Sequence, residues 1–497
     1  MLLRLPAADQ GGRDALFRYR PKIIQGGMGV GISTWPLARA VAQLGQMGVI
    51  SGTVIEGVIA GRLQMGDPGG HLQRAFSNFP FRAIAERVWN DYFVEGGKDP
   101  GRPFKPVPMW SDRPSRKLTE LAVVSAFSEV WLAREGHNGL VGMNLLTKIQ
   151  LPTLALLFGA ILAGVDCILM GAGIPRAIPQ ALEQLSLCKE ASLRLQVQGD
   201  TGGRVYEVRF DPREITGGSP IDLACPKFLA IIASDTLATS LYKKPEGKRV
   251  DGFVIEGPTA GGHNAPPRGG MQEFNERGEP VYGSRDEVDL EKIRELGLPF
   301  WMAGSYGTPE GLKKALEEGA EGIQVGTAFA LSDESGMDPT IKQRLRQLAS
   351  DGSLEVITRP RVSPTGFPIK IAELPGSLSD PEVYRNRQRI CDRGYLRDAY
   401  VKADGTLGFR CPAEPVDIFV KKGGDVTETD GRVCLCNGLL ATAGFAQVRR
   451  DGEAEELIVT LGEDLRAARA LLAGGKQSYS ARDVVNYLLS GIGESAS

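Results

Sequence analysis

The chain has 497 residues, of which 42% are hydrophobic and 24% charged, and its formal net charge is −2. This length exceeds one ordinary hydrophobic core, so we expect one large domain with additions. The near-neutral charge excludes a basic nucleic-acid-binding protein and gives no reason to expect a membrane partner. The seven cysteines are unevenly placed and no secretory leader is recognised, so we expect a cytoplasmic protein.

The first fifty residues contain one unit of a parallel sheet. Residues 22–25 predict a short strand, which a glycine-rich loop over 26–33 follows. A helix is predicted over 36–45 and a second strand over 48–52, and this strand, loop, helix and strand order is typical of α/β folds. The loop lacks a complete G-x-G-x-x-G motif, so it is not a dinucleotide-binding fingerprint.

A long segment over residues 62–135 interrupts this alternation. It is rich in proline, glycine and aromatic residues, and it has a helical pattern near its end, over 118–133. We predict an insertion that packs over one end of the sheet, because a connection this long in a compact domain is more often functional than idle.

The alternation then resumes. Six further strands are predicted over residues 140–144, 165–170, 227–233, 253–255, 299–304 and 322–326. Helical segments follow most of these strands, and a polar stretch over 196–222 predicts a hairpin. Eight strand–helix units within residues 1–335 favour a (β/α)₈ TIM barrel over the alternative, an open doubly wound sheet. A barrel of this kind carries its active site at the carboxyl ends of its strands.

The last two predicted strands end in loops that suit an anion. Residues 303–307 and 324–329 combine glycines with the Ser305 and Thr327 hydroxyls, and a helix begins near Pro309. Backbone N–H groups in such loops bind phosphate, and the loops after strands seven and eight of barrels do so repeatedly. The alternative is ordinary strand-to-helix turn chemistry, which favours the same residue types.

His263 is the first candidate for chemistry. It follows the apolar strand over 253–255, and Gly261 and Gly262 before it allow the backbone to approach a ligand closely. The alternatives are a solvated loop histidine or a core histidine bonded to a carbonyl. Glu256 is a second titratable candidate, either as a catalytic group or as a brace for the loop.

Four segments together resemble one enzyme family. They are Ile-Gln-Gly-Gly-Met-Gly over 24–29, Gly-Pro-Thr-Ala-Gly-Gly-His over 257–263, Met-Ala-Gly over 302–304 and Gly-Ile-Gln-Val-Gly-Thr-Ala-Phe over 322–329. In this order they resemble the FMN-dependent nitronate monooxygenases, formerly called 2-nitropropane dioxygenases, and the related flavin-dependent enoyl reductases. The resemblance covers residues from about 20 to 335.

The resemblance implies an FMN site and an oxidoreductase activity on a small molecule. The implied cofactor-binding residues are Gln25, Gly26, Gly27, Met28, Asn144, Gly261, Gly262, Gly304, Ser305, Gly326 and Thr327. His263 would be the catalytic acid or base. The implied reaction is oxidation of alkyl nitronates with dioxygen, and the alternatives are NAD(P)H-dependent reduction of an enoyl thioester and a non-catalytic flavoprotein. Residues 264–267 and the long insertion depart from the family pattern beside the substrate pocket.

Beyond the barrel, residues 336–385 form a predicted connector. A helix is expected over 338–348, and a proline-rich stretch over 356–368 carries Arg359 and Arg361. This stretch is either a rigid connector or a lid with an anion contact.

The remaining residues, 386–497, form a predicted module with four cysteines, Cys391, Cys411, Cys434 and Cys436. Their spacing matches neither a zinc ribbon nor a ferredoxin motif. Three interpretations stay open: core packing, a metal or iron–sulfur centre with these four residues as ligands, and a redox-active pair. We expect at least three of the four thiols to cluster. Two amphipathic helices are predicted over 463–473 and 481–489.

Overall fold

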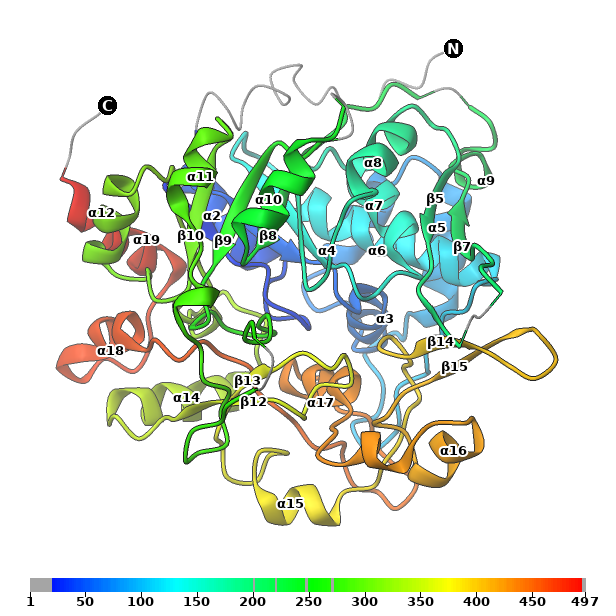
Figure 1. Ribbon diagram of the computed structural model, residues 1–497. Helices are drawn as coiled ribbons and strands as arrows, with labels where there is room; N and C mark the ends of the chain where they lie inside the picture. The colour runs from blue at the N-terminus through cyan, green and yellow to red at the C-terminus, as the bar shows by residue number, and fades with distance from the viewer. Residues whose placement is uncertain (1–19, 200–201, 220, 246–248, 270–271, 494–497) are drawn as a thin grey trace.

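The computed structural model describes residues 20–199, 202–219, 221–245, 249–269 and 272–493. Eight parallel strands form its central sheet (Figure 1). Around the sheet they run β1 (Ile23–Gln25), β11 (Gly322–Val325), β10 (Phe300–Ala303), β9 (Gly252–Glu256), β8 (Lys227–Ile232), β4 (Cys167–Gly171), β3 (Val141–Leu146) and β2 (Gly48–Ser51). Each strand corresponds to one predicted from the sequence.

Met47 closes this sheet into a barrel. The Gln25 amide donates to the Met47 carbonyl over 2.9 Å, and the Met47 amide donates to the Ile23 carbonyl over 3.1 Å. Since Met47 directly precedes β2, these bonds join the two outer strands of the sheet. The predicted (β/α)₈ barrel is confirmed.

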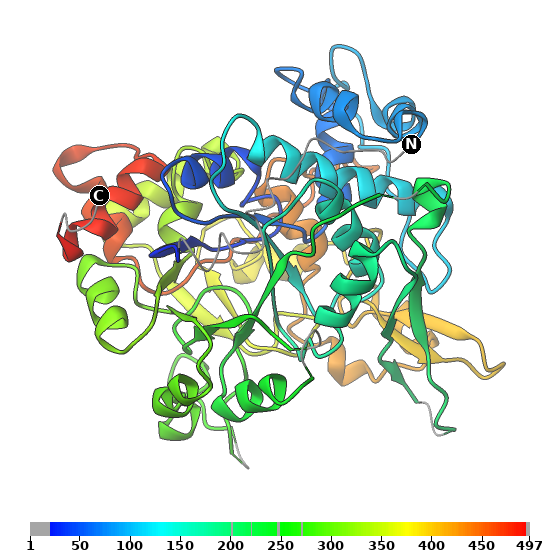
Figure 2. The ribbon, with the colours of Figure 1, turned by 90° about the horizontal axis from the view of Figure 1, so that it is seen from above.

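A ring of helices surrounds the strands (Figure 2). Its members are α2 (Trp35–Gln43), α3 (Ile55–Gln64), α7 (Thr153–Leu162), α8 (Ile178–Ser186), α10 (Asp235–Tyr242), α11 (Leu290–Glu295), α12 (Pro309–Glu317), α13 (Thr327–Ala330) and α14 (Pro339–Ser350). Alternation along each strand separates two buried layers. On β10, for example, Phe300 and Met302 pack toward the helices, whereas Trp301 and Ala303 belong to the interior cluster.

The amino-terminal end of the barrel interior is filled by side chains. Trp301 is fully buried there, and its indole N–H donates to the Pro21 carbonyl over 2.8 Å. Ile24, Val49 and Leu229 belong to the same interior cluster. The remaining interior space therefore opens at the opposite, carboxyl end of the strands.

The insertion forms three helices, α4 (His71–Asn78), α5 (Arg82–Tyr92) and α6 (Arg116–Arg134). Helix α6 contacts α2 and α7 and so belongs to the helical ring, and α4 and α5 pack against α6 (Figure 2). The insertion thus lies mainly beside the barrel. Its final loop does reach the first turn of α3, where the Trp110 indole N–H donates to the Glu56 carboxylate over 3.0 Å.

Residues 356–472 lie beneath the strands in Figure 1, whereas the last helix lies beside them, and both parts share the barrel's main hydrophobic core. They include the antiparallel pair β12 (Val356–Arg359) and β13 (Ile369–Ala372), then α15 (Pro381–Asn386), α16 (Val416–Lys421) and α17 (Leu435–Thr442). The pair β14 (Asp398–Val401) and β15 (Leu407–Arg410) adds the short strand β6 (Val197–Gln198) from the barrel region. The two predicted terminal helices are α18 (Arg466–Leu472) and α19 (Ala481–Leu489).

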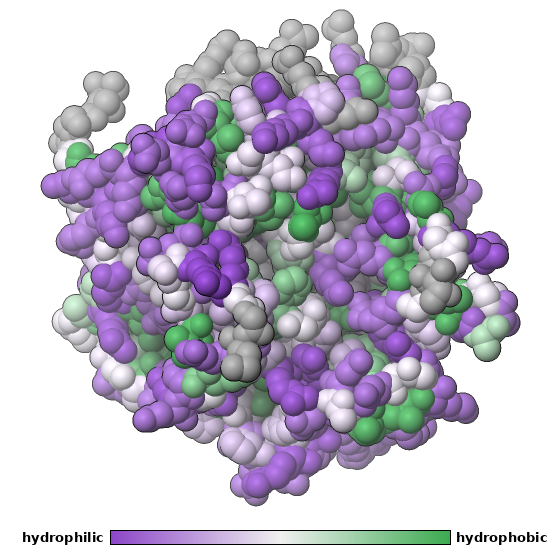
Figure 3. Space-filling model, in the orientation of Figure 1, coloured by the Kyte–Doolittle hydropathy of each residue, from purple (hydrophilic) through white to green (hydrophobic). Residues whose placement is uncertain are grey.

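The predicted hairpin after α8 is formed by β5 (Ala191–Arg194) and β7 (Glu207–Phe210). It begins five residues earlier than the polar stretch that predicted it, because its first strand is partly apolar. Figure 3 shows hydrophilic residues over most of one face, with hydrophobic residues in small separate groups. In the described part of the chain, no helix has the length and apolar character needed to cross a membrane.

Candidate active site

A cavity of about 260 Å³ opens at the carboxyl ends of the barrel strands. The loops after β1, β3, β9, β10 and β11 all contribute to its lining. Of the residues predicted to bind a cofactor, it is lined by Gly26, Gly27, Met28, Asn144, Gly261, Gly262, Gly304, Ser305, Gly326 and Thr327. His263 and Glu256 line the same cavity. The sequence motifs therefore meet in one place, at the end of the barrel where enzymes of this fold carry their sites.

Gln25 is the exception among the predicted cofactor-binding residues. It is fully buried beneath the cavity and does not line it. Its amide oxygen accepts from the Val49 amide over 2.9 Å, and its amide nitrogen donates to the Ser33 hydroxyl over 2.8 Å. Gln25 thus fixes the glycine-rich loop from below, and the predicted direct contact with a cofactor is not supported.

Gly27 permits a close approach between two strands at the cavity wall. A Cβ atom at this position would lie 2.2 Å from the Asn144 Cβ. The half-buried Asn144 side chain itself faces the cavity, at the end of β3. Only glycine can therefore hold the loop after β1 against β3 without displacing this polar side chain.

The loops after β10 and β11 form the predicted cradle. Gly304 and Ser305 both have left-handed backbone conformations, with φ of 87° and 59°. A Cβ at Gly304 would lie 3.0 Å from the Ala260 amide nitrogen, so glycine brings this loop against the loop after β9. A non-glycine residue rarely adopts the conformation of Ser305, and such strain gathers at ligand sites.

Gln324 adds a polar group to the floor of the cavity that the sequence analysis did not identify. It lies on β11 beside Ile24 and Ala303, two residues of the barrel interior. Its Oε1 atom is buried and has no hydrogen-bond partner among the described residues. A buried acceptor without a donor is costly, so this atom favours a ligand that donates to it. A polar residue at an inward position of an apolar strand was the signal available in the sequence.

His263 is fixed by a segment distant in the chain. Its Nε2 atom is hydrogen-bonded to the Ser363 hydroxyl at 2.6 Å. The Lys370 amide donates to the Gly262 carbonyl over 3.0 Å, so β13 holds the histidine loop in place. Burial lowers the pKa of His263 to about 4, because the charged imidazolium loses its hydration. The imidazole is therefore neutral across the physiological range of pH.

Burial has the opposite effect on the pKa of Glu256. Burial raises the pKa of its carboxyl group to about 7, and no described residue donates a hydrogen bond that offsets this cost. The side chain does not brace the loop, which was one of its two predicted roles. A carboxyl group that titrates near neutrality on a cavity wall can exchange a proton with a ligand.

The connector contributes to the site, although not through its arginines. Arg359 pairs with Glu373 at 2.8 Å, and Arg361 donates to the Thr427 carbonyl over 2.8 Å. Neither residue lines the cavity, and their partners Glu373 and Thr427 do not line it either, so the predicted anion contact is not supported. Ser363, which lies between them and β13, is the residue of this stretch that reaches His263.

A second unpredicted contribution comes from the carboxyl-terminal region. Leu439 of α17 and the segment Thr460–Ala467 form part of the cavity wall. We call this segment the strap. Its lining residues are Thr460, Leu461, Gly462, Asp464 and Ala467.

The four cysteines lie near one another, with hydrogen bonds between Cys391 and Cys411 and between Cys434 and Cys436. A hydrogen bond with Cys391 and burial raise the pKa of the Cys411 thiol. In the same way, a hydrogen bond with Cys436 and burial raise the pKa of the Cys434 thiol. None of the four forms a disulfide. Among the described residues, no group of three or more His, Cys, Asp or Glu side chains is arranged to hold a metal ion. The predicted four-ligand centre is therefore not supported. The electrostatic interactions of Cys411 with Cys436 and of Cys434 with Cys391 are consistent with the expected clustering of the thiols.

Comparison with known proteins shows similarity to one family model. Residues 227–362 match the family model of nitronate monooxygenase. This segment runs from β8 through β12 and contains His263 and both loops of the cradle. The resemblance inferred from the sequence motifs is confirmed for this part of the chain.

Individual relatives match over similar stretches. A probable nitronate monooxygenase of Staphylococcus saprophyticus is 33% identical over 102 residues, which are 20% of this chain and 27% of the relative. A nitronate monooxygenase of Pseudomonas aeruginosa is 32% identical over 123 residues, which are 25% of this chain and 33% of the relative. The matches thus span about a third or less of these relatives.

A solved structure, FabK from Thermotoga maritima, aligns over 96% of this chain and 94% of its own, with a TM-score of 0.47 and 16% identity.

Proposed function

We propose that the protein is an FMN-dependent oxidoreductase that oxidises alkyl nitronates with dioxygen. The match of residues 227–362 to nitronate monooxygenase supports this proposal, because that segment supplies His263 and the cradle to one cavity. The uneven placement of the seven cysteines supports action in the cytoplasm.

The cavity fits FMN in three respects. Gly304, Ser305, Gly326 and Thr327 offer backbone N–H groups and hydroxyls to a phosphate. Gly27 leaves the wall beside β3 free of a side chain, so that a flat ring can lie close to the backbone. The unpartnered Gln324 Oε1 can accept a hydrogen bond from a ring N–H group.

When bound, FMN would accept electrons from the substrate and pass them to dioxygen. The protein's part is to bind and orient the substrate. A nitronate is an anion, and the neutral imidazole of His263 can donate a hydrogen bond to one of its oxygens without the cost of ionising a buried group. Ser363 holds the ring in one orientation through its hydroxyl.

For a neutral nitroalkane, the same imidazole is a base that stays unprotonated down to a pH of about 4. Glu256 lies on the same cavity and can receive or return that proton near pH 7. The site therefore has a hydrogen-bond donor for a nitronate and a proton acceptor for a neutral nitroalkane.

Titration of the purified protein with FMN tests the cofactor, with one FMN bound per chain as the expected result. Anaerobic addition of NADPH to the FMN-loaded protein then separates the reactions. We expect the flavin absorbance to persist with NADPH, because an enoyl reductase would bleach it and a nitronate monooxygenase depends on its nitro substrate. Failure of a folded protein to bind FMN, or bleaching by NADPH alone, would contradict the proposal.

A further inference from the structure

The cavity has an unusual charge for a site that would hold a phosphate. Among the described residues that line it, none is lysine or arginine, whereas Glu256 and Asp464 bring two carboxyl groups. A phosphate monoester carries close to two negative charges at neutral pH. The barrel loops alone supply neutral donors, so a cation from elsewhere would strengthen the site.

The strap connects the two loops of the cradle. At one end, the Gly462 amide donates to the Thr327 hydroxyl over 2.8 Å. At the other, the Arg466 guanidinium donates through Nη2 to the Ser305 carbonyl over 2.9 Å. The strap therefore crosses the phosphate end of the cavity and touches both loops that would bind the phosphate.

Close packing fixes the amino-terminal part of the strap. A Cβ at Gly462 would lie 3.0 Å from the Thr327 hydroxyl oxygen, and a Cβ at Gly261 would lie 2.7 Å from the Gly462 nitrogen. Just before the strap, the Ala372 amide donates to the Val459 carbonyl over 3.0 Å. Within the strap, Leu461 is buried in the main core. The backbone path that leads to Arg466 is thus determined by contacts with the barrel and β13.

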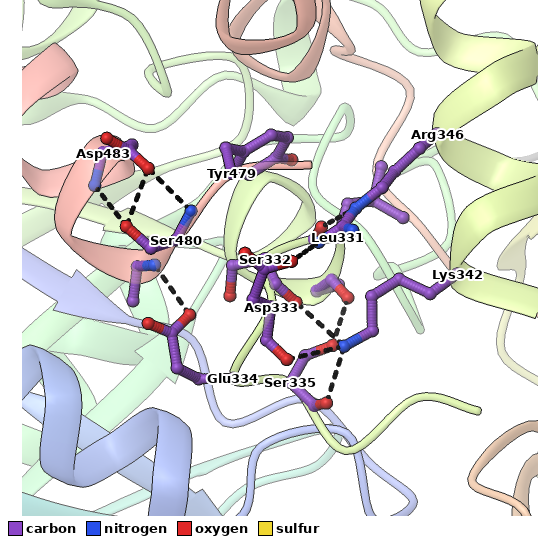
Figure 4. A network of polar contacts seen from close by, with 12 residues as sticks. Leu331, Ser332, Asp333, Glu334, Ser335, Lys342, Arg346, Tyr479, Ser480 and Asp483 are labelled. Atoms are coloured by element: carbon purple, nitrogen blue, oxygen red, sulfur yellow. Dashed lines mark hydrogen bonds and ion pairs between the residues drawn. The ribbon is translucent and has the colours of Figure 1, made fainter. Parts of the chain in front are cut away.

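The chain after the strap is held as firmly (Figure 4). The Tyr479 hydroxyl donates to the Ala328 carbonyl over 2.9 Å, one residue beyond Thr327 of the cradle. The Asp333 amide donates to the Tyr479 carbonyl over 2.9 Å, and the Arg346 guanidinium binds the Asp333 carboxylate at 2.7 Å. The segment between α18 and α19 is therefore anchored to α13, whose first residue is Thr327.

Arg466 is an exposed cation at this position. Its side chain is 61% exposed, and it pairs with Asp464 at 2.7 Å while it binds Ser305. Its Nε and Nη2 groups donate to the Asp464 carboxylate over 2.8 and 2.7 Å, and this pairing holds the guanidinium beside the cradle. Only the Nη1 group keeps N–H donors without a partner among the described residues, and such charged donors bind phosphate oxygens well.

We propose that Arg466 is the cationic contact for the FMN phosphate, brought to the barrel by the strap, and that Asp464 is the residue that positions it. This inference rests on the proposed FMN site. It assigns to the carboxyl-terminal region a part in cofactor binding that the barrel cannot provide alone.

Comparison of FMN with riboflavin tests this inference, because the two differ only in the phosphate. Dissociation constants for both are measured by flavin fluorescence for the natural protein and for Arg466→Ala. We expect the variant to bind FMN about tenfold more weakly or worse, with its riboflavin affinity unchanged. Arg466→Lys keeps the charge but loses the planar donor set, so it should fall between the two.

Arg469→Ala is the matched control, since it removes the same charge from an exposed position of the same helix, and Arg469, unlike Arg466, makes no described hydrogen bond to Ser305. We expect it to leave both affinities unchanged. If Arg466→Ala weakens FMN and riboflavin equally, or neither, the inference is overturned while the FMN site stands. If the natural protein binds neither flavin, the proposed function is overturned and the inference with it.

Discussion

The imidazole of His263 and the hydroxyl of Ser363 lie one hundred residues apart in the sequence and 2.6 Å apart in the folded protein. Ser363 is fully buried, and the Val433 amide fixes its neighbour Val362 through a hydrogen bond of 3.0 Å. The orientation of the candidate catalytic group thus depends on the region after the barrel. Replacement of His263 removes the imidazole itself, whereas replacement of Ser363 removes only the hydrogen bond that orients it.

We expect His263→Ala to retain FMN and to lower kcat/KM with propyl nitronate by a factor of about 10² to 10⁴, which is the usual effect of losing one positioned acid–base group. Steady-state oxygen consumption measures the loss, and flavin absorbance verifies the cofactor. Ser363→Ala should cost less, because the imidazole remains. Unchanged turnover in His263→Ala would assign this histidine a purely structural role.

Glu256 should govern the pH dependence of substrate binding near neutrality. Its pKa is about 7, so its carboxyl group is neutral below that pH and anionic above it. We expect the KM for the nitronate anion to rise as pH increases through 7, because the carboxylate repels the substrate. The rise should disappear in Glu256→Gln.

Protonation of His263 cannot produce the same change, since the pKa of this residue is about 4. The measurement is KM between about pH 6 and pH 8, with the pH range chosen to span the titration of Glu256. A rise in KM that persists in Glu256→Gln would show that another group is responsible.

Gly27 should tolerate no side chain. Because an added Cβ would lie 2.2 Å from the Asn144 Cβ, Gly27→Ala must displace the loop after β1 or strand β3. We expect a loss of stability of about 1 to 3 kcal/mol and weaker FMN binding. Gly283→Ala is a suitable control, since a Cβ there meets nothing within 4 Å and its φ is −130°. Equal denaturation midpoints and FMN affinities for the two variants would contradict this account of the wall.

Glu56 should make stability depend on pH. This carboxyl group is fully buried and bonded to Trp110 and Tyr395, and burial raises its pKa from 4.5 to about 7. The folded state therefore keeps its proton to a higher pH than the unfolded state does. Its contribution is present below pH 4.5 and is lost as pH rises through about 7, with a total of roughly 3 kcal/mol.

Urea unfolding of the natural protein and of Glu56→Gln at pH 5 and pH 7.5 measures this difference. The amide keeps the shape of the neutral carboxyl group, so the variant should lose less stability between the two pH values. If both proteins lose the same amount, Glu56 does not titrate in this window.

The fold followed from local patterns. Short apolar runs such as Phe253–Ile255, most of them closely followed by glycine, identified all eight strands, because strands buried on both faces are largely apolar. The cradle also followed, since its glycines and hydroxyls lie within a few residues of β10 and β11. The strands and these two loops could therefore be predicted, because they depend on residues that are close together in the sequence.

Other parts of the site arise from long-range packing. Ser363 and the strap come from segments that carry no motif, and only the folded chain brings them to His263 and Thr327. The family resemblance assigned Gln25 to the ligand, but its amide is used by Ser33 and the Val49 backbone. The cysteine spacing gave no pairing, because contacts among Cys391, Cys411, Cys434 and Cys436 depend on the path of the chain between them.

Anaerobic mixing of the FMN-loaded protein with propyl nitronate tests the central claim most directly. The proposed function predicts that the oxidised flavin absorbance disappears on mixing and returns when dioxygen is admitted, with loss of the nitronate. A flavin that stays oxidised in the presence of saturating nitronate would contradict it.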